Sequence, residues 1–455
     1  MKNTQVTRRR FFTAAGSAGI GAGLGLTAID GLTKGLTASL LQQTTGSKPT
    51  TKNLILTNAS LIDSVRPEPQ LKMTVVVRNG RIVRVGGGSP TRTELEGSRV
   101  IDLGAAWLLP GLCDAHSHLI SPLQDPPGST VNDRYLRMGK AAIEAFQSGI
   151  TAARVVGAPN FMDVAWRKAF STGMFLGPRL FVAGHTIVPT AGHGASYDYG
   201  QTVVADGPAA VRRAVREQIQ GDVDLIKLVI TGGVFGLRWD SLDQTDFLPD
   251  EIDAAFQTAA QRQYKVAVHA GNPEAVKIAV RAGAYTIEHG YVLDEESIAL
   301  MVERKTIYVP TLCVTFLTDE SSESQFEKQW TKRWPMPPNL RERANQRRTG
   351  HVQAFKAALA AGVRIACGAD QSPMVETTFI EIELLVRSGM TPMQAIVAAT
   401  RVSSEAATAA KDLGTIEVGK LADFLVVAAS PLSDIYNLRK TVMVFKEGEL
   451  VVDKR

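Results

Sequence analysis

Side chains of the types that bind metals follow several short apolar runs along this chain. In the segment Asp114-Ala115-His116-Ser117-His118, strand alternation points both imidazoles to the same side. An aspartate, Asp370, follows another apolar run. Imidazole and carboxylate groups are standard ligands of divalent transition metals, and unrelated structural roles for so many of them are improbable. The pattern predicts a metal site with six candidate residues: His116, His118, Lys227, His269, His289 and Asp370.

Lys227 is the unusual member of this set, because metal ions would repel a charged ammonium group. One interpretation is an ion pair or an outward-facing side chain. The other is that its neutral amine has reacted with carbon dioxide to form a carbamate, an anion that can bridge two metals. Since the carbamate removes the electrostatic conflict, we expect a carboxylated lysine.

These residues need a scaffold that brings the ends of distant strands together. Between residues 108 and 412 the chain alternates eight short apolar runs with helix-like segments, which is typical of a parallel sheet in an α/β fold. Eight strands and eight helices close most naturally into a (β/α)8 TIM barrel, with its site at the carboxyl ends of the strands. An open doubly wound sheet is the alternative. The runs are 108–114, 151–156, 179–183, 225–230, 265–270, 285–288, 307–312 and 364–369.

The segments on either side of residues 108–412 show a different sequence pattern. Residues 53–107 and 413–455 contain short alternating strands, with Asn79-Gly80 and Glu447-Gly448 as hairpin turns. We expect these segments to form a small β-sandwich domain, with the barrel of residues 108–412 inserted between its two parts.

Several motifs, taken together, resemble the amidohydrolase superfamily, and the resemblance covers residues 53–455. Lys227 and the following Thr231-Gly232-Gly233 are similar to its prolidase-like (Xaa-Pro dipeptidase-like) binuclear branch. That branch cleaves amide bonds of dipeptides and N-acyl amino acids, and it includes enzymes that detoxify aryl-amide mycotoxins. The motifs are Pro110-Gly111-Leu112-Cys113-Asp114-Ala115-His116-Ser117-His118, the run Ile226 to Val234, His269, His289, Gly368-Ala369-Asp370, and the tail segments Gly389 to Ile396 and Leu413 to Asp423.

The resemblance implies a role for each candidate ligand. His116, His118 and Asp370 would hold one divalent metal ion, and His269 and His289 would hold a second. The carbon dioxide-derived carbamate on Lys227 would bridge the two ions, which would share a hydroxide nucleophile. Asp370 would be the catalytic residue that takes the proton of this hydroxide and passes it to the leaving amine. We expect zinc, although mixed nitrogen and oxygen ligands discriminate weakly among metals.

Three further residues are candidates for substrate binding. His193 lies in a Gly-rich loop that resembles the Gly-Gly-His segment of the branch, with Thr190-Ala191 as a departure, and it predicts a substrate or oxyanion contact rather than a loop cap. Gly232 and Gly233 allow either a tight turn or a close approach of the backbone to substrate. His351, in an Arg- and Ala-rich helical stretch, is expected at the surface.

Residues 314–339 have no counterpart in a regular barrel. Their Ser- and Glu-rich start, Trp330, Trp334 and Pro335-Met336-Pro337-Pro338 predict a long loop over the mouth of the site. A subunit contact is the competing interpretation, since both tryptophans fit either role.

The first forty residues have the features of a targeting signal. Thr7-Arg8-Arg9-Arg10-Phe11-Phe12 precedes a weakly apolar Gly- and Ala-rich stretch, which resembles a twin-arginine export signal in residues 1–40, followed by a linker in 41–52. We therefore expect a periplasmic or secreted protein, with membrane contact only through an uncleaved signal. This segment holds +4 of the net charge of +5, and the nearly neutral remainder disfavours a nucleic-acid partner.

Together these observations predict an exported, metal-dependent amidohydrolase acting on dipeptides or N-acyl amino acids. The expected partners are a small-molecule substrate and further copies of the chain in a homo-oligomer. A cyclic-amide hydrolase that resembles imidazolonepropionase is an alternative, but such relatives use one metal and lack the lysine. A non-catalytic binding protein of the same fold is a third reading, but such proteins have lost the ligands that this chain keeps.

Overall fold

The computed structural model describes residues 53–121, 124–196 and 200–455. The predicted export signal (1–40) and linker (41–52) lie outside the described residues. Among the residues that are described, no helix combines the length and the apolar character needed to cross a membrane. Residues Thr51 to Arg455 form one compact unit, to which all the elements below belong.

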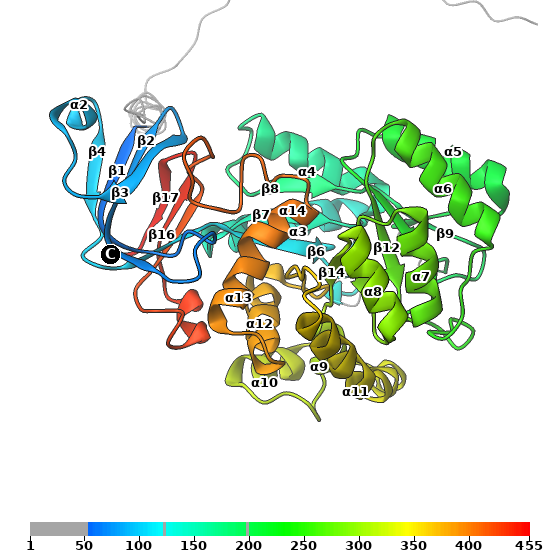
Figure 1. Ribbon diagram of the computed structural model, residues 1–455. Helices are drawn as coiled ribbons and strands as arrows, with labels where there is room; N and C mark the ends of the chain where they lie inside the picture. Colours follow the sequence, from blue (N-terminus) through cyan, green and yellow to red (C-terminus); the bar gives the residue numbers. More distant parts are fainter. Residues whose placement is uncertain (1–52, 122–123, 197–199) are drawn as a thin grey trace, which may run out of the picture. The chain divides into compact units, whose positions relative to one another are not determined.

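Both ends of this unit contribute strands to one eight-stranded sheet, ordered β17-β16-β15-β5-β1-β2-β3, with β4 paired to β1. Figure 1 shows the blue amino-terminal strands beside the red carboxyl-terminal ones. The joint is the antiparallel pairing of β5 with β15, where Phe424 lies opposite Pro110. The strands are β1 (Leu54–Leu61), β2 (Gln70–Arg78), β3 (Arg81–Gly87), β4 (Arg99–Asp102), β5 (Trp107–Pro110), β15 (Phe424–Val427), β16 (Thr441–Lys446) and β17 (Glu449–Asp453).

The prediction of a sheet built from both chain ends is confirmed, although its strands form one hydrogen-bonded sheet rather than two separate layers. Leu56, Val75, Phe424 and Phe445 belong to the apolar cluster that fills this sheet's core. Both predicted hairpin turns are present. Asn79-Gly80 has φ of 48° and 78°, and Glu447-Gly448 has φ of 49° and 74°, the left-handed pairs that match the twist of a two-residue hairpin.

The remaining strands are parallel and form two sheets, ordered β6-β7-β8 and β10-β9-β11-β12-β13-β14. In most of these strands, β8 and β10 excepted, side chains are buried on both faces, as in sheets covered by helices. The strands are β6 (Leu112–Ser117), β7 (Ile150–Val155), β8 (Arg179–Val182), β9 (Thr186–Val188), β10 (Thr202–Val204), β11 (Ile226–Val229), β12 (Val266–Ala270), β13 (Thr286–His289) and β14 (Ile307–Val309).

These parallel strands differ from the expected eight in three ways. The first predicted run divides at Gly111 into β5, in the end sheet, and β6. The short strands β9 and β10 were not predicted. The eighth run, 364–369, forms only an isolated bridge between Ile365 and Tyr308. Its backbone passes very close to β6, since a Cβ on Gly368 would lie 2.6 Å from the Cβ of His116.

Backbone hydrogen bonds nevertheless link the two parallel sheets on both sides. Cys367 O accepts from Ala115 N at 2.8 Å, and Arg364 O accepts from Tyr308 N at 2.8 Å. On the other side, Val182 O accepts from Leu225 N at 3.4 Å. The sheets are therefore joined through a few backbone hydrogen bonds on each side rather than through one continuous ladder.

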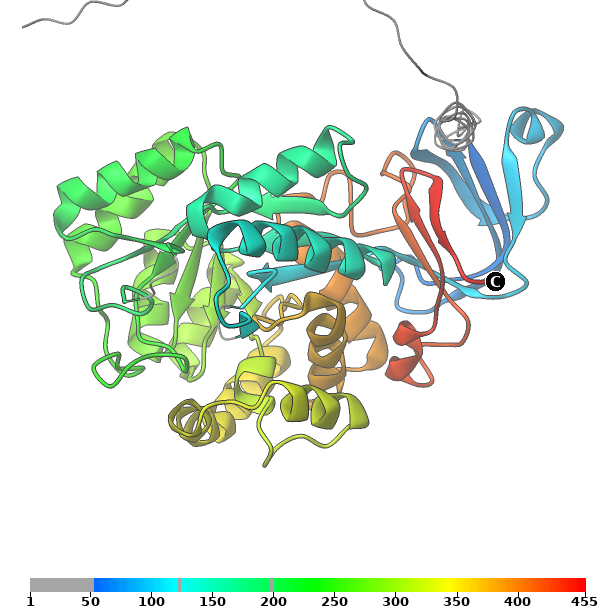
Figure 2. The same ribbon diagram turned by 180° about the vertical axis from the view of Figure 1, so that it is seen from behind.

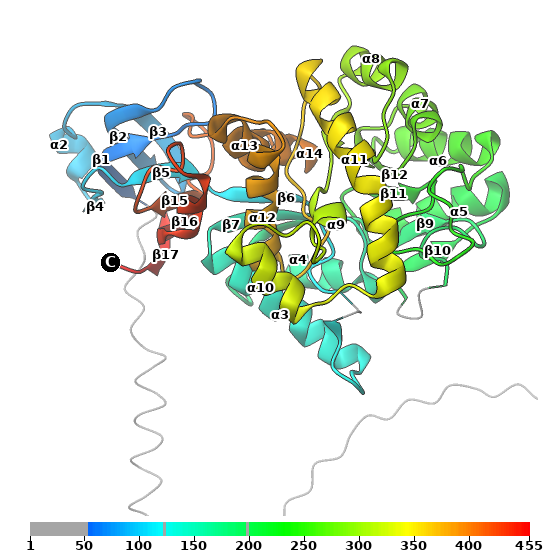
Figure 3. The ribbon, with the colours of Figure 1, turned by 90° about the horizontal axis from the view of Figure 1, so that it is seen from below.

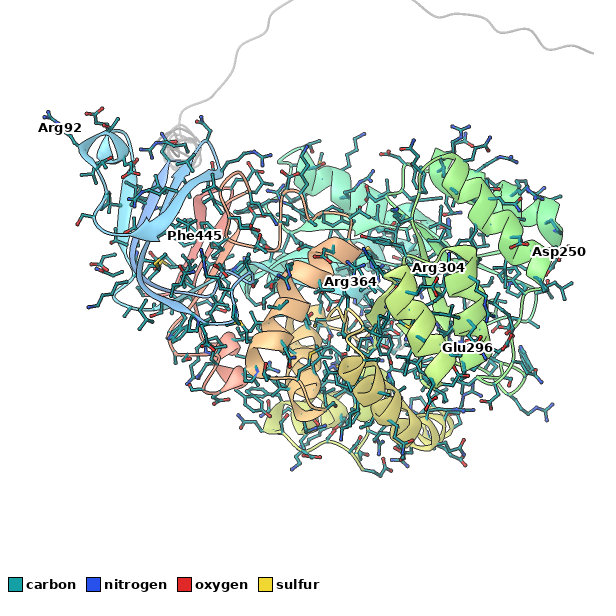
Figure 4. The ribbon with its side chains drawn as sticks, viewed as in Figure 1. Arg92, Asp250, Glu296, Arg304, Arg364 and Phe445 are labelled. Atoms are coloured by element: carbon teal, nitrogen blue, oxygen red, sulfur yellow. The ribbon has the colours of Figure 1, made fainter. Side chains whose placement is uncertain are left out.

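Helices follow most of the parallel strands and cover their outer faces (Figure 2). Several begin at side-chain caps, as where Asn272 accepts from Ala275 N and Asp294 accepts from Ser297 N. Their outer faces carry exposed charges, such as Asp250 on α6 and Glu296 and Arg304 on α8 (Figure 4). These helices are α3 (Val131–Gln147), α4 (Met162–Ser171), α5 (Gly207–Gln220), α6 (Pro249–Gln261), α7 (Pro273–Ala282), α8 (Glu295–Arg304) and α12 (Met374–Arg387). Shorter elements are α2 (Arg92–Leu95), α13 (Pro392–Val397), α14 (Ser403–Ala406), η2 (Pro159–Phe161), η3 (Ala398–Val402) and η4 (Ile435–Arg439).

The expectation of a long structureless loop at 314–339 is wrong. The segment contains most of α9 (Cys313–Phe316), all of α10 (Gln325–Arg333) and the start of α11 (Pro338–Ala360), which lie together in the foreground of Figure 3. Ser324 caps α10 by accepting from Glu327 N. Trp330 is buried, and its indole N–H donates to Ser372 O at 2.9 Å. This tryptophan therefore packs inside the chain, next to a residue that lines the cavity described below.

Candidate active site

A cavity of about 220 Å³ lies at the carboxyl ends of the parallel strands. His116 comes from β6, Lys227 from β11, His269 from β12 and His289 from the end of β13. All six predicted metal ligands line this cavity, and so does His193. Side chains that are far apart in sequence thus meet where the strand pattern placed them.

Three of these residues form a compact group of ligand atoms, all within 4.8 Å of one another: His116, His118 and Asp370. The Nε2 atoms of His116 and His118 lie 3.4 and 3.2 Å from Asp370 Oδ1. Burial alone would raise the pKa of Asp370, but the two imidazoles hold it well below its usual value. Two ring nitrogens and an ionised carboxylate converge here in a donor set that suits a divalent metal ion.

Hydrogen bonds on the far side of each ring fix which nitrogen faces this group. His118 Nδ1 lies 2.8 Å from Gly157 O, and His116 Nδ1 lies 2.7 Å from Glu288 Oε2. Because these oxygens only accept, each Nδ1 carries a proton, and Nε2 is the ring nitrogen on the side of Asp370, where a metal ion would bind. Metal-binding histidines are oriented in this way in proteins.

Glu288 belongs to a fully buried ion pair behind His116. Arg154 Nη2 donates to its two carboxylate oxygens at 2.7 and 2.8 Å, and Arg154 Nη1 donates to Thr286 Oγ1 at 2.9 Å. Burial would raise the pKa of Glu288, but the guanidinium holds it well below its usual value. The carboxylate is therefore ionised and can accept from His116.

Lys227 is buried, with 2% of its surface exposed, and its Nζ has no hydrogen-bond partner among the described residues. Burial lowers the pKa of this amine to about 8. Burial thus makes the neutral amine easier to reach, and an amine that faces the candidate ligands with no described hydrogen-bond partner fits the carbamate chemistry predicted from the sequence.

His269 and His289 lie beside this lysine, with their ring centroids 4.3 Å apart. Burial lowers the pKa of both imidazoles well below the usual value, so they are neutral, the form that binds metals. His269 Nε2 lies 3.0 Å from Gly232 O, and His289 Nδ1 lies 2.7 Å from Thr311 Oγ1. Nδ1 of His269 and Nε2 of His289 are left as the ligand atoms.

The backbone is strained at two of the candidate ligands. His289 has φ of 71° and Asp370 has φ of 49°, in the left-handed region that residues with a Cβ rarely adopt. Such conformations cost on the order of 1–3 kcal/mol and cluster at functional sites. They occur where the two side chains enter the cavity, His289 at the end of β13 and Asp370 after the segment 364–369.

His193 meets the cavity from the loop after β9. Its Nδ1 lies 2.6 Å from Asp240 Oδ2, and its ring centroid lies 4.9 Å from that of His269. Among the described residues, the cavity lining includes neither Gly232 nor Gly233. These glycines instead contact the residues that line it, since Gly232 O accepts from His269 and a Cβ on Gly233 would lie 2.5 Å from His193 Nε2.

Part of the cavity lining is apolar or aromatic and includes Val234, Phe235, Tyr291 and Leu340. Tyr291 stacks on His289, with centroids 5.3 Å apart. The edge of the His351 ring lies against Tyr291 at 5.1 Å, and His351 is fully buried on α11. The expectation that His351 lies at the surface is therefore wrong, because one face of this Arg-rich helix packs inward.

Sequence reasoning missed three charged residues of the site: Arg154, Asp240 and Glu288. Arg154 left a signal, because a charged residue in the middle of the apolar run 151–156 needs a buried partner. Glu288 directly precedes a candidate ligand. Asp240 left no comparable signal, since it lies in a polar loop where an aspartate is ordinary.

Comparison with known proteins agrees with this geometry. Residues 107–451 match the amidohydrolase family. The chain is 32% identical over 381 residues to ochratoxinase of Aspergillus niger, covering 75% of each protein. A solved structure of a Xaa-Pro dipeptidase with methionine bound in its active site is 31% identical, with a TM-score of 0.76, over 88% of this chain and 99% of that one. A prolidase structure in complex with N-methylphosphonate-L-proline is 26% identical, with a TM-score of 0.77, over 88% of this chain and 100% of that one.

The family match spans most of the sequence and includes every predicted ligand, and the fold and the ligand geometry support it independently. The chain belongs to the amidohydrolase family and is a metal-dependent hydrolase that acts on carbon–nitrogen bonds.

Proposed function

We propose that this enzyme hydrolyses amide bonds of dipeptides or N-acyl amino acids at a centre for two divalent metal ions. The observation that carries the proposal is the buried Lys227 amine, without a described partner, beside the ligand group of His116, His118 and Asp370. The similarity to a Xaa-Pro dipeptidase, a prolidase and an ochratoxinase supports the choice of amide substrates.

The proposed scaffold is a closed (β/α)8 barrel, in which the segment 364–369 completes the ring between β14 and β6. The backbone bonds from Ala115 to Cys367 and from Tyr308 to Arg364 support this closure. In a barrel the carboxyl ends of all eight strands face one mouth, which accounts for the convergence of the ligands.

In this proposal, His116, His118 and Asp370 would hold one ion, His269 and His289 would hold the other, and a carbamate on Lys227 would supply an anionic ligand to both. When bound, the two ions polarise the amide carbonyl and lower the pKa of the attacking water. Asp370 accepts a proton from that water as the new carbon–oxygen bond forms. It then delivers the proton to the amine nitrogen as the carbon–nitrogen bond breaks.

His193 is proposed to contact the substrate, because it is the imidazole of the cavity that is not assigned to a metal ion. Gly232 and Gly233 are proposed to shape the substrate side indirectly, by leaving room for His193 and for the carbonyl that accepts from His269. The apolar part of the cavity lining, which includes Leu340, would receive an apolar part of the substrate.

The test is to replace Lys227 with Ala and with Arg. Both variants lose the anionic bridge, since a guanidinium stays protonated and cannot form a carbamate. We expect fewer than two metal ions per chain and a loss of turnover of at least about 100-fold, the upper end of the loss seen when residues that orient metal ligands are removed. Metal content by mass spectrometry and a hydrolysis screen of dipeptides and N-acyl amino acids measure the two effects.

Lys265→Ala is the matched control, because Lys265 is an exposed lysine just before β12. Bicarbonate should accelerate reconstitution of the metal-stripped wild-type enzyme and have no effect on either Lys227 variant. A Lys227→Ala enzyme that holds two metal ions and turns over normally would show that the lysine is structural and that the two-metal proposal is wrong.

A further inference from the structure

The carboxylate of Asp240 is almost completely enclosed, with 4% of its side chain exposed, and both of its oxygens are engaged. Oδ2 lies 2.6 Å from His193 Nδ1, and Oδ1 accepts from Gly233 N at 3.0 Å. One carboxylate thus ties the imidazole on the loop after β9 to the glycine loop after β11.

Arg343, on α11, supports the same loop from outside the cavity. Its guanidinium donates to Gly233 O and to Asp240 O, both at 2.6 Å, and to Val234 O at 3.2 Å. Because these acceptors lie at both ends of the segment 233–240, the arginine fixes the spacing between the glycines and Asp240.

Three glycines of this loop leave the space that the pair occupies. A Cβ on Gly232 would overlap Asp240 Oδ1, and a Cβ on Gly236 would overlap Asp240 Oδ2. A Cβ on Gly233 would reach the His193 ring. None of these glycines has a positive φ, so the close approach of Asp240 and His193, rather than backbone conformation, explains the residue type.

The pairing has a chemical consequence for His193. Since a carboxylate only accepts, Nδ1 carries the proton that it donates to Asp240, and the ring plane is fixed. His193 lines the cavity, and the pairing holds its ring there in one orientation and one tautomer.

We propose that Asp240 is a positioning residue that acts on substrate through His193, and that Arg343 holds the loop in which Asp240 works. This inference rests on the proposed function in one respect, namely that His193 contacts the substrate. It makes Asp240 and His193 a functional unit rather than two independent contacts.

A double-mutant cycle tests the unit. In the holoenzyme, Asp240→Asn keeps the size of the side chain but removes the charge, and we expect kcat/KM to fall by about 10- to 100-fold, as for other residues that orient an active histidine. His193→Gln should cost as much or more. If Asp240 acts through His193, adding Asp240→Asn to His193→Gln should cost less than threefold more. Losses that multiply in the double variant, or normal kinetics in Asp240→Asn, would overturn the proposal.

Two measurements separate this role from a general structural one. Metal content and thermal unfolding of each variant show whether the fold and the metal centre survive. Asp243→Asn is the matched control, since Asp243 lies on the same stretch of chain, is 65% exposed and pairs with Arg347 of α11. We expect this control to leave kcat/KM within twofold of the wild-type value.

Nuclear magnetic resonance of the imidazoles tests the pairing without any substrate. The chain has seven histidines, so 15N-histidine labelling and the His193→Gln variant assign the His193 signal. We expect a protonated Nδ1 with a strongly hydrogen-bonded proton in the wild-type enzyme, and loss of that proton signal in Asp240→Asn. A wild-type His193 protonated only at Nε2 would refute the pairing. If the wild-type enzyme cleaved none of the amides screened, the proposed function would fail, while this spectrum would still decide whether Asp240 sets the tautomer of His193.

Discussion

The site contains two histidine–carboxylate pairs that are nearly equal in length and differ in their surroundings. His116 and Glu288 are 2.7 Å apart, with 1% and 0% of their side chains exposed, whereas His193 and Asp240 are 2.6 Å apart, with 14% and 4% exposed. An arginine supports each pair. Arg154 donates to the carboxylate of Glu288 itself, whereas Arg343 donates to main-chain carbonyls around Asp240.

This difference shows how one chemical unit can serve two purposes. The inner pair, His116 and Glu288, lies where water is excluded, so its carboxylate needs a cation in direct contact. Together with Arg154 it forms a rigid support for a candidate metal ligand. The outer pair, His193 and Asp240, lies at the cavity, and its histidine lines the space that a substrate would fill. Its arginine sets the shape of a loop rather than balancing a charge.

Glu288→Gln should produce the largest effect, because it leaves the guanidinium of Arg154 buried without its counter-charge. Removing one partner of a buried ion pair costs about 3–5 kcal/mol, so we expect a fall of that order in the free energy of unfolding. Metal affinity should fall by about 10- to 100-fold, because His116 loses the acceptor that orients it. Chemical denaturation and metal titration measure the two effects.

The matched comparison is Asp240→Asn, the same loss of charge in the outer pair. It should retain the metal and lose less stability than Glu288→Gln. Equal losses of stability and metal in the two variants would mean that the pairs do not differ in purpose.

Removal of metal by a chelator should have an intermediate effect. A ligand present at 100 times its dissociation constant stabilises the folded state by about 2.7 kcal/mol, so the stripped enzyme should unfold several degrees lower. The imidazole signals of His116 and His118 should change strongly in the resonance spectrum, because these side chains would lose the metal ion proposed to bind them. The His193 Nδ1 proton should persist, because Asp240 rather than a metal ion holds it. Its disappearance on stripping would place the outer pair within the metal centre.

Arg343→Gln should have the smallest measurable effect. It weakens three hydrogen bonds to main-chain carbonyls, and a typical bond from a charged donor contributes about 1.5–3 kcal/mol, of which a glutamine amide and water recover a part. We expect a few-fold decrease in kcat/KM with unchanged metal content, measured by steady-state kinetics and mass spectrometry. A loss as large as that of Asp240→Asn would show that the arginine contributes more than the loop's shape.

The convergence of the ligands was predictable from the strand pattern, because that pattern follows a local rule. Period-two alternation places His116 and His118 on one side of a strand, and parallel strands bring their ends to one edge. The two hairpin turns were predictable for the same reason. A two-residue hairpin turn needs left-handed φ values at two adjacent residues, and Asn-Gly and Glu-Gly adopt them here.

Other features depend on contacts between distant segments, which a single sequence does not encode locally. Glu288 and Arg154 become partners only when β7 and β13, which belong to different sheets, bring these two side chains together in the interior. Three-residue strands such as β9 have too few residues to show a period. The inward face of α11, with His351, is hidden in the sequence because its buried positions are occupied mostly by alanines and a histidine, among many arginines.

The antiparallel joint between β5 and β15 also governs the order in which this protein can fold. Until residues 424–427 leave the ribosome, one edge of β5 lacks the strand that pairs with it in the complete sheet. The apolar side chains around that edge also lack their contacts with Phe424 and Phe445. Unpaired strand edges and exposed apolar surface are what aggregation exploits, and pairing across so long a stretch of chain is slow. Synthesis of the last thirty or so residues therefore completes the sheet. A chain that stops short of Phe424 leaves that edge open for another molecule to pair with.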